Sequence, residues 1–169
     1  MSVGAQVILQ DQHRLDTPIL MVLLKKPLPL NGRNFRGQLK VFFENEALDV
    51  TASGDEKEAS LVLNWDGHSY AAYSVDKPVP ENEFFASLQK SASKATLEKV
   101  THQHQAHMVI SPLHNATNYG EAIDQSIHFM RFAEKLTQGL RALGYFWTTS
   151  EILLLPDQFI AATEQALDA

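Results

Sequence analysis

The chain has 169 residues, of which 44% are hydrophobic and 20% are charged, and its formal net charge at pH 7 is −6. This length and composition predict one globular domain with a single well-buried core. Because an acidic surface repels phosphate groups and the basic residues form no stripe in the sequence, we expect no binding of nucleic acid. The sequence contains no cysteine, which excludes disulfide bonds, cysteine-bound zinc and a thiolate nucleophile.

The N-terminal sequence predicts neither export nor membrane insertion. It lacks the basic segment and the long apolar segment of a secretory signal. The longest apolar run, PILMVLL at residues 18–24, suits a buried strand and is too short to cross a bilayer. We therefore expect a cytoplasmic protein without membrane contacts. Residues 1–17 are predicted to be an N-terminal arm, and residues 18–169 a single α+β domain.

The first half of the domain alternates between strand and helix patterns. Residues 19–24 predict a buried strand, residues 33–45 a helix, and the small and charged residues 50–59 a loop. In residues 60–76, two runs of alternating apolar residues flank Asp66-Gly67, a pair that favours the type I′ turn of a β-hairpin.

The second half contains the longest predicted helix. Residues 77–100 begin with prolines and become helical from about Pro80. Apolar spacing predicts a helix over residues 119–143, with Asn118 and Glu121 as a capping pair and Gly144 just after its end. The remaining segments are a strand at 106–111, a loop at 112–120, a strand at 144–150, a short apolar piece at 151–156 and a helix at 157–168.

These elements follow the order β-α-β-β-α-β-α-β-α. Helices interleave with strands, but a hairpin interrupts the alternation. The order predicts an α+β fold in which a single mixed β-sheet with a central β-hairpin carries helices packed on it.

Four histidines lie in the segment HQHQAHMVISPLH: His102, His104, His107 and His114. Zinc needs three or four convergent ligands, and neither a helical nor an extended backbone brings three of these rings together. We therefore expect no metal site. His102 and His104 are predicted to lie at the end of an element, His107 within a strand and His114 in a loop.

The interpretation of His107 has two alternatives. It is either a core histidine whose ring nitrogens are hydrogen-bonded, which we favour, or a pH-sensitive or catalytic group. Ser111 and His114 follow at the end of the same strand, where ligands bind in many sheets. A serine hydrolase is not favoured, because the sequence has no G-x-S-x-G motif and Ser111 precedes a proline.

Aromatic and hydroxyl side chains extend the set of candidate ligand-binding residues. The segment WTTSE at residues 147–151 has the composition of a pocket wall, although a strand end followed by a turn has the same composition. The candidate ligand-binding residues are therefore His107, Ser111, His114, Tyr119, Trp147 and Ser150. No cofactor and no catalytic residue are assigned.

Four segments in this order resemble a bacterial family known as domain of unknown function 4261. They are ILMVLLKKPLPL, YSVDKPVPENEF, AHMVIS and GYFWTTSEILLLPDQFI, and the resemblance covers residues 18–162. The resemblance implies an α+β fold. It implies no known reaction, cofactor or catalytic residue, and it draws attention to His107, Trp147 and Ser150 without giving them a role.

Three functional hypotheses remain at this point. The leading one is a non-catalytic domain that binds a protein partner or forms a homo-oligomer. The alternative is an enzyme or small-ligand binder with a pocket at the C-terminal end of the strand 106–111. A third, an immunity or adaptor protein that pairs with a toxin or effector, is compatible with a small acidic chain.

Overall fold

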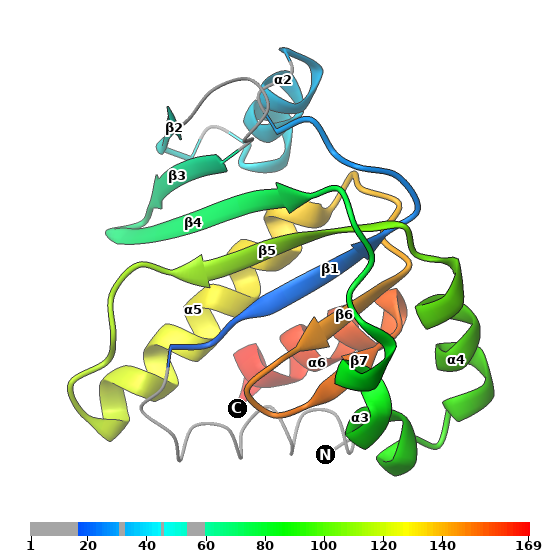
Figure 1. Ribbon diagram of the computed structural model, residues 1–169. Coiled ribbons are helices and arrows are strands. Elements are labelled where there is room, and N and C mark those ends of the chain that lie inside the picture. Colours follow the sequence, from blue (N-terminus) through cyan, green and yellow to red (C-terminus); the bar gives the residue numbers. More distant parts are fainter. Residues whose placement is uncertain (1–16, 31–32, 45, 54–59) are drawn as a thin grey trace.

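A computed structural model describes residues 17–30, 33–44, 46–53 and 60–169. The described residues form one seven-stranded sheet with helices on both of its faces (Figure 1). This arrangement confirms the predicted α+β fold with helices packed on a single sheet. The predicted N-terminal arm, residues 1–17, lies outside the described residues except for Thr17.

The elements alternate along the chain much as the sequence predicts. In chain order they are β1 (Leu20–Leu24), α2 (Arg33–Phe42), β2 (Leu48–Ser53), β3 (Ser60–Trp65), β4 (His68–Val75), the 3-10 helix η1 (Glu81–Phe84), α3 (Phe85–Lys90), α4 (Lys94–Gln103), β5 (Ala106–Pro112), α5 (Tyr119–Thr137), β6 (Gly144–Trp147), β7 (Ile152–Leu154) and α6 (Pro156–Asp168). The order of the strands across the sheet is β2-β3-β4-β5-β1-β6-β7.

The sheet is antiparallel rather than mixed, which corrects the prediction. All six pairings among the described strands are antiparallel. The unit β5-α5-β6 does contain two strands that run in the same direction, but β1 lies between them and pairs with both. The insertion of β1 also means that the predicted central hairpin, β3-β4, lies toward the β2 edge of the sheet.

The hairpin itself forms as predicted. Asp66 and Gly67 both have positive φ angles, 48° and 77°, as a type I′ turn requires. Leu61, Leu63 and Trp65 are buried on one face of β3. The pairing of β3 with β4 and the φ angles of the turn both fit a two-residue hairpin, which sets the position of Asp66.

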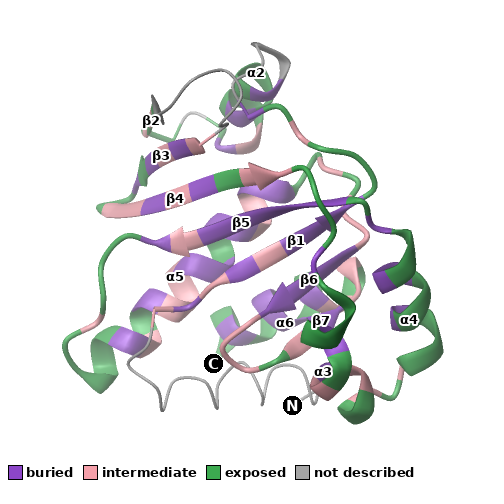
Figure 2. Ribbon diagram, viewed as in Figure 1, coloured by how far each residue is buried: buried purple, intermediate pink, exposed green. Residues whose placement is uncertain are grey.

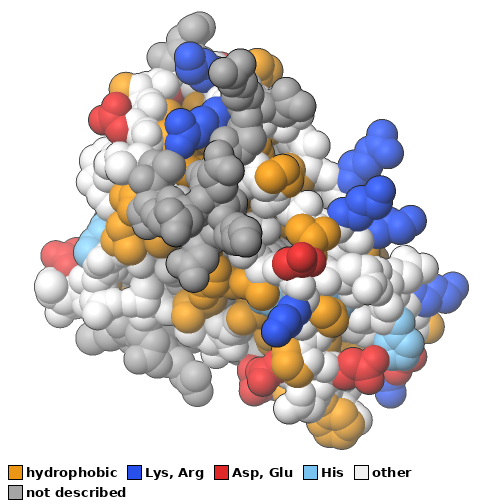
Figure 3. Space-filling view, turned by 45° about the horizontal axis from the view of Figure 1, so that its top comes forward, with side chains coloured by type: hydrophobic (Ala, Val, Ile, Leu, Met, Phe, Trp, Pro, Cys, Tyr) orange, Lys and Arg blue, Asp and Glu red, His pale blue; other side chains and the backbone are white. Residues whose placement is uncertain are grey.

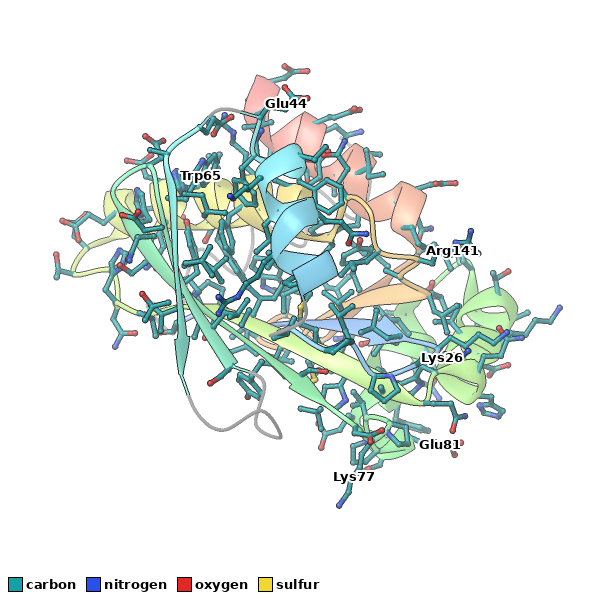
Figure 4. The ribbon with its side chains drawn as sticks, turned by 90° about the horizontal axis from the view of Figure 1, so that it is seen from above. Lys26, Glu44, Trp65, Lys77, Glu81 and Arg141 are labelled. Atoms are coloured by element: carbon teal, nitrogen blue, oxygen red, sulfur yellow. The ribbon has the colours of Figure 1, made fainter. Side chains whose placement is uncertain are left out.

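Two apolar layers hold the helices to the sheet. One face of the sheet packs against α2, α5 and α6, and the other packs against η1, α3 and α4 at the end formed by β1, β6 and β7. The central strands are mostly buried, whereas the helices expose their outer sides (Figure 2). Seen from above, Trp65 lies beside α5, whereas Lys77 and Glu81 lie on the opposite side of the sheet (Figure 4).

The segment predicted as a loop, residues 50–59, contains the end of a strand. Leu48–Ser53 forms β2 at the edge of the sheet, and the remaining residues 54–59 lie outside the described residues. Leu48 and Val50 pack on the core, whereas Asp49 and Thr51 point to solvent. An edge strand with exposed polar residues has a weak sequence pattern, which explains the error.

The predicted helix 119–143 ends earlier than expected, at Thr137. Its start is confirmed, since the Asn118 side chain accepts a hydrogen bond from the Glu121 amide. After the turn that follows, the Leu143 amide donates to the Leu23 carbonyl oxygen, so the chain has already joined the sheet. Gly144 is therefore the first residue of β6 rather than a helix cap.

Gly139, in the turn that follows α5, lies close to α2. A Cβ atom at this position would lie 2.0 Å from Cζ of Phe42. The absence of a side chain lets the turn pass close to α2. The other predicted helical segment, residues 77–100, is divided into η1, α3 and α4, with a break at residues 91–93.

Candidate ligand-binding site

The structure does not bring the six predicted ligand-binding residues into one pocket. His107 and Trp147 project from opposite faces of the sheet, because they pair with Leu23 and Leu20 of β1, which belong to different apolar layers. Trp147 is buried, and its ring lies 5.4 Å from that of Phe129.

The other predicted residues are distributed over three further places. Ser111 is on β5, partly buried and on the same face as His107. His114 lies in the loop before α5, and Tyr119 is the first residue of α5 with 47% of its surface exposed. Ser150 lies in the turn between β6 and β7.

His107 has the geometry of the core histidine favoured from the sequence. It is 8% exposed, and its Nδ1–H group donates a 2.8 Å hydrogen bond to the carbonyl oxygen of Lys77. Burial lowers its pKa, so the ring is neutral at pH 7. His107 therefore joins β5 to the segment before η1.

His104 lies at the end of α4, as predicted, and it is more buried than the sequence indicates. Its Nδ1–H group donates to the Thr101 carbonyl oxygen at 2.6 Å, and its Nε2 atom accepts from the Val79 amide at 2.8 Å. This arrangement requires a neutral ring, because a protonated Nε2 would face an N–H group. Burial accordingly lowers the pKa of His104.

A second group of polar side chains joins the β3-β4 hairpin to α5. His128, on α5, donates from Nε2 to the Asp66 carboxylate at 3.2 Å, and its Nδ1 accepts from the buried Tyr70 hydroxyl group. Because a carboxylate only accepts, the proton of the neutral ring must be on Nε2. Burial raises the pKa of Tyr70, so its hydroxyl group remains a donor. We call Asp66, Tyr70 and His128 the hairpin lock.

Other histidines surround the hairpin lock. The ring of His68 stacks on His128 with a centroid distance of 3.9 Å, and His114 lies 5.6 Å from His68. Stacked imidazoles direct their lone pairs along nearly parallel planes rather than toward one point, so they are poorly placed to share a metal ion. Consistently, no group of three or more His, Asp or Glu residues in the described part of the chain has a metal-binding arrangement.

We expect Tyr70→Phe to lower the free energy of unfolding by about 1–2 kcal/mol, because it removes the donor to a mostly buried ring nitrogen. Urea unfolding monitored by circular dichroism measures this change. Tyr73→Phe is the control, since Tyr73 is 44% exposed on the same strand and its change should be close to zero. Equal stability of the two variants would contradict a structural role for the hairpin lock.

A cavity of about 240 Å³ lies between α3 and β7, which are neighbours in the fold (Figure 1). Its polar lining comes from Ser87, Lys90, Ser91, Ser93, Ser150, Glu151 and Gln158. Its apolar lining includes Ala92 and the strand residues 152–154. We call this cavity the serine pocket. Ser150 is the one residue of the six predicted from the sequence that lines it.

Hydrogen bonds fix the walls of the serine pocket. The Ser87 hydroxyl group donates to the carbonyl oxygen of Glu151, which joins α3 to the β6-β7 turn. Glu151 has a φ angle of 52°, a left-handed conformation that is unfavourable for a residue with a side chain. The Ser150 hydroxyl oxygen is buried and has no hydrogen-bond partner among the described residues.

Comparisons with family models, with curated proteins and with solved structures found no match for this chain. They neither confirm nor refute the resemblance to domain of unknown function 4261. Among the described helices, none has the length and apolar character needed to cross a membrane.

Proposed function

We propose that the protein binds a small molecule in the serine pocket. The observation that carries this proposal is the Ser150 hydroxyl group, which is buried in the pocket wall without a partner. Leaving a buried hydroxyl group unpaired costs about 1–3 kcal/mol. We infer that the hydroxyl group turns about χ1 to another staggered position when a ligand enters the pocket, and that the ligand then supplies the missing partner.

The dimensions of the serine pocket limit the ligand. Its volume of about 240 Å³ is below the roughly 300–1,000 Å³ of pockets that hold drug-sized molecules. At about 30 Å³ for each water in the liquid, it has room for about eight waters. The ligand is therefore a compact molecule with one polar end for the hydroxyl groups and one apolar part for Ile152 and Leu154.

A protein-binding or self-associating role has less support. Among the residues whose burial is described, the seven exposed large apolar side chains are spread over α2, β4, α3, α5, α6 and the loop before α5. On the face shown in Figure 3, hydrophobic side chains form several separate groups among polar ones. Binding surfaces for proteins instead tend to present one contiguous apolar patch.

Ser150→Ala is the variant that tests the proposal. We expect its free energy of unfolding to be unchanged or raised by about 1 kcal/mol, because the substitution removes an unpaired buried group. We expect weaker binding of compounds that occupy the pocket. The measurement is an NMR screen of compact polar molecules, in which the backbone amides of residues 92 and 152–154 report occupancy.

Ser111→Ala is the matched control, since Ser111 belongs to the site predicted at the end of β5. It should leave binding in the serine pocket unchanged. If compounds shift the amides around Ser111 and His114 instead, the ligand site is at the end of β5. If no compound shifts the amides of residues 92 and 152–154, the serine pocket is not a ligand site.

A further inference from the structure

Three of the four serine hydroxyl groups that line the pocket have hydrogens left to donate; Ser87 is the exception, because it donates to the Glu151 carbonyl oxygen. Ser91 accepts a hydrogen bond from the Ser93 amide at 3.1 Å, and Ser93 accepts one from the Gln158 side chain at 3.4 Å. Because each hydroxyl oxygen acts as an acceptor there, its hydrogen remains available. Ser150 adds a third hydroxyl group. A ligand group rich in acceptors, such as a carboxylate, matches this surplus of donors.

One cation and one anion also line the serine pocket. Lys90 Nζ lies 3.8 Å from Glu151 Oε2, and both side chains are more than half exposed. An exposed ion pair at this distance contributes little to stability, so either partner can turn to a ligand at small cost. A ligand with only a negative charge would gain from Lys90 but would be repelled by Glu151. A ligand that carries both charges gains from both.

The third feature is the apolar wall. Ala92 provides it at the α3-α4 connection, and residues 152–154 provide it on the β7 side. The pocket has room for about eight waters, and this volume is enough for a ligand with a branched aliphatic side chain, an amino group and a carboxylate. An acidic or basic side chain would leave its charge unpaired against this wall.

We propose that the serine pocket binds a free α-amino acid with an apolar side chain, such as leucine, a proposal that rests on the proposed function. The ligand carboxylate accepts from the serine hydroxyl groups and pairs with Lys90. The ligand ammonium group pairs with the Glu151 carboxylate. The aliphatic side chain packs on the apolar wall formed by residues 152–154.

The test is an NMR titration of the full chain with L-leucine and with two analogues that each lack one charge. These are 4-methylpentanoate, which lacks the amino group, and 3-methylbutylamine, which lacks the carboxylate. We expect leucine to shift the amides of residues 92 and 152–154 and each analogue to bind at least tenfold more weakly. L-Glutamate and L-lysine should leave these amides unshifted.

Two variants test which protein side chain pairs with each charged group of the ligand. Lys90→Gln should weaken binding of leucine about tenfold and should not weaken binding of 3-methylbutylamine, because Lys90 repels its ammonium group. Glu151→Gln should weaken leucine to a similar extent and should not weaken binding of 4-methylpentanoate, because Glu151 repels its carboxylate. Lys94→Gln and Glu98→Gln are the matched controls, because this pair on α4 has the same 3.8 Å separation and does not line the pocket. They should not change the affinity for leucine.

The outcomes separate the two proposals. If 4-methylpentanoate or 3-methylbutylamine binds as tightly as leucine, the ligand is not recognised as a zwitterion and the inference is wrong. If leucine fails to shift residues 92 and 152–154 while other compounds do, the ligand class is wrong and the proposed function stands. If leucine binds equally well to both charge variants, Lys90 and Glu151 do not recognise it.

Discussion

Phe132→Ala is expected to lower the free energy of unfolding by about 3–5 kcal/mol, the largest effect of any single substitution proposed for this protein. Phe132 is fully buried on α5. Its ring stacks on Tyr70 at a centroid distance of 3.9 Å and lies 5.7 Å from Phe43 and 6.1 Å from Trp65. It therefore joins α5 to β3, to β4 and to the residue that follows α2, and its removal leaves a cavity among them.

Urea unfolding at neutral pH measures this change. Phe85→Ala is the control, because Phe85 is 67% exposed on α3 and its truncation should change the free energy by less than about 0.5 kcal/mol. Because both variants replace phenylalanine with alanine, the difference between their free energies of unfolding measures the effect of burial. A loss below about 1 kcal/mol for Phe132→Ala would mean that the aromatic cluster is not packed as described.

His104→Ala is expected to lower the free energy of unfolding by about 2–4 kcal/mol at pH 7.5. The ring is 2% exposed and lies edge-on to Phe84 at 5.6 Å. Its removal leaves the Val79 amide and the Thr101 carbonyl oxygen without their partner. The His102→Ala control should have little effect, because the His102 side chain is 68% exposed at the same end of α4.

The same variant should reduce the dependence of stability on pH. Burial lowers the pKa of His104, His107 and His128 in the folded protein, so the unfolded chain takes up protons on these rings first as the pH falls. The free energy of unfolding therefore decreases below about pH 6.5 and levels off below the folded pKa values. Each ring contributes at most about 1.4 kcal/mol per pH unit.

Unfolding measured at intervals from pH 7.5 to pH 5 checks this prediction. Glu46 and Glu121 have lowered pKa values and so titrate below this range. His104→Ala should therefore show a shallower decrease than the unchanged protein, because one of the three rings is absent. A decrease of the same steepness in both proteins would show that His104 does not contribute to it.

Local signals in the sequence predicted much of the fold. Asp66-Gly67 marked the hairpin, and Asn118 with Glu121 marked the start of α5, because turns and caps depend on a few adjacent residues. The end of α5 at Thr137 was missed because apolar residues at helical spacing continue past it to Leu140 and Leu143. The antiparallel sheet was missed because no local pattern reports that β1 lies between β5 and β6.

The candidate site was less predictable for the same reason. Ser150 was identified from its hydroxyl-rich segment, but its companions Ser87, Ser91 and Ser93 lie in a segment whose pattern indicates only helix. Their proximity depends on the packing of α3 against β7. His128 was missed because, on the sequence, it is one polar residue in a long amphipathic helix. Only the packing of α5 on the hairpin brings it to Asp66 and Tyr70.

The position of β1 has a consequence for how the chain folds as it is synthesised. β1 leaves the ribosome before every other described strand, yet its hydrogen-bonding partners, β5 and β6, are made much later. Until then both edges of an apolar strand stay open, while the hairpins of β2, β3 and β4 can form from nearby residues. The middle of the sheet is therefore completed only once β6 has been made, and until then the nascent chain must keep LMVLL from aggregating.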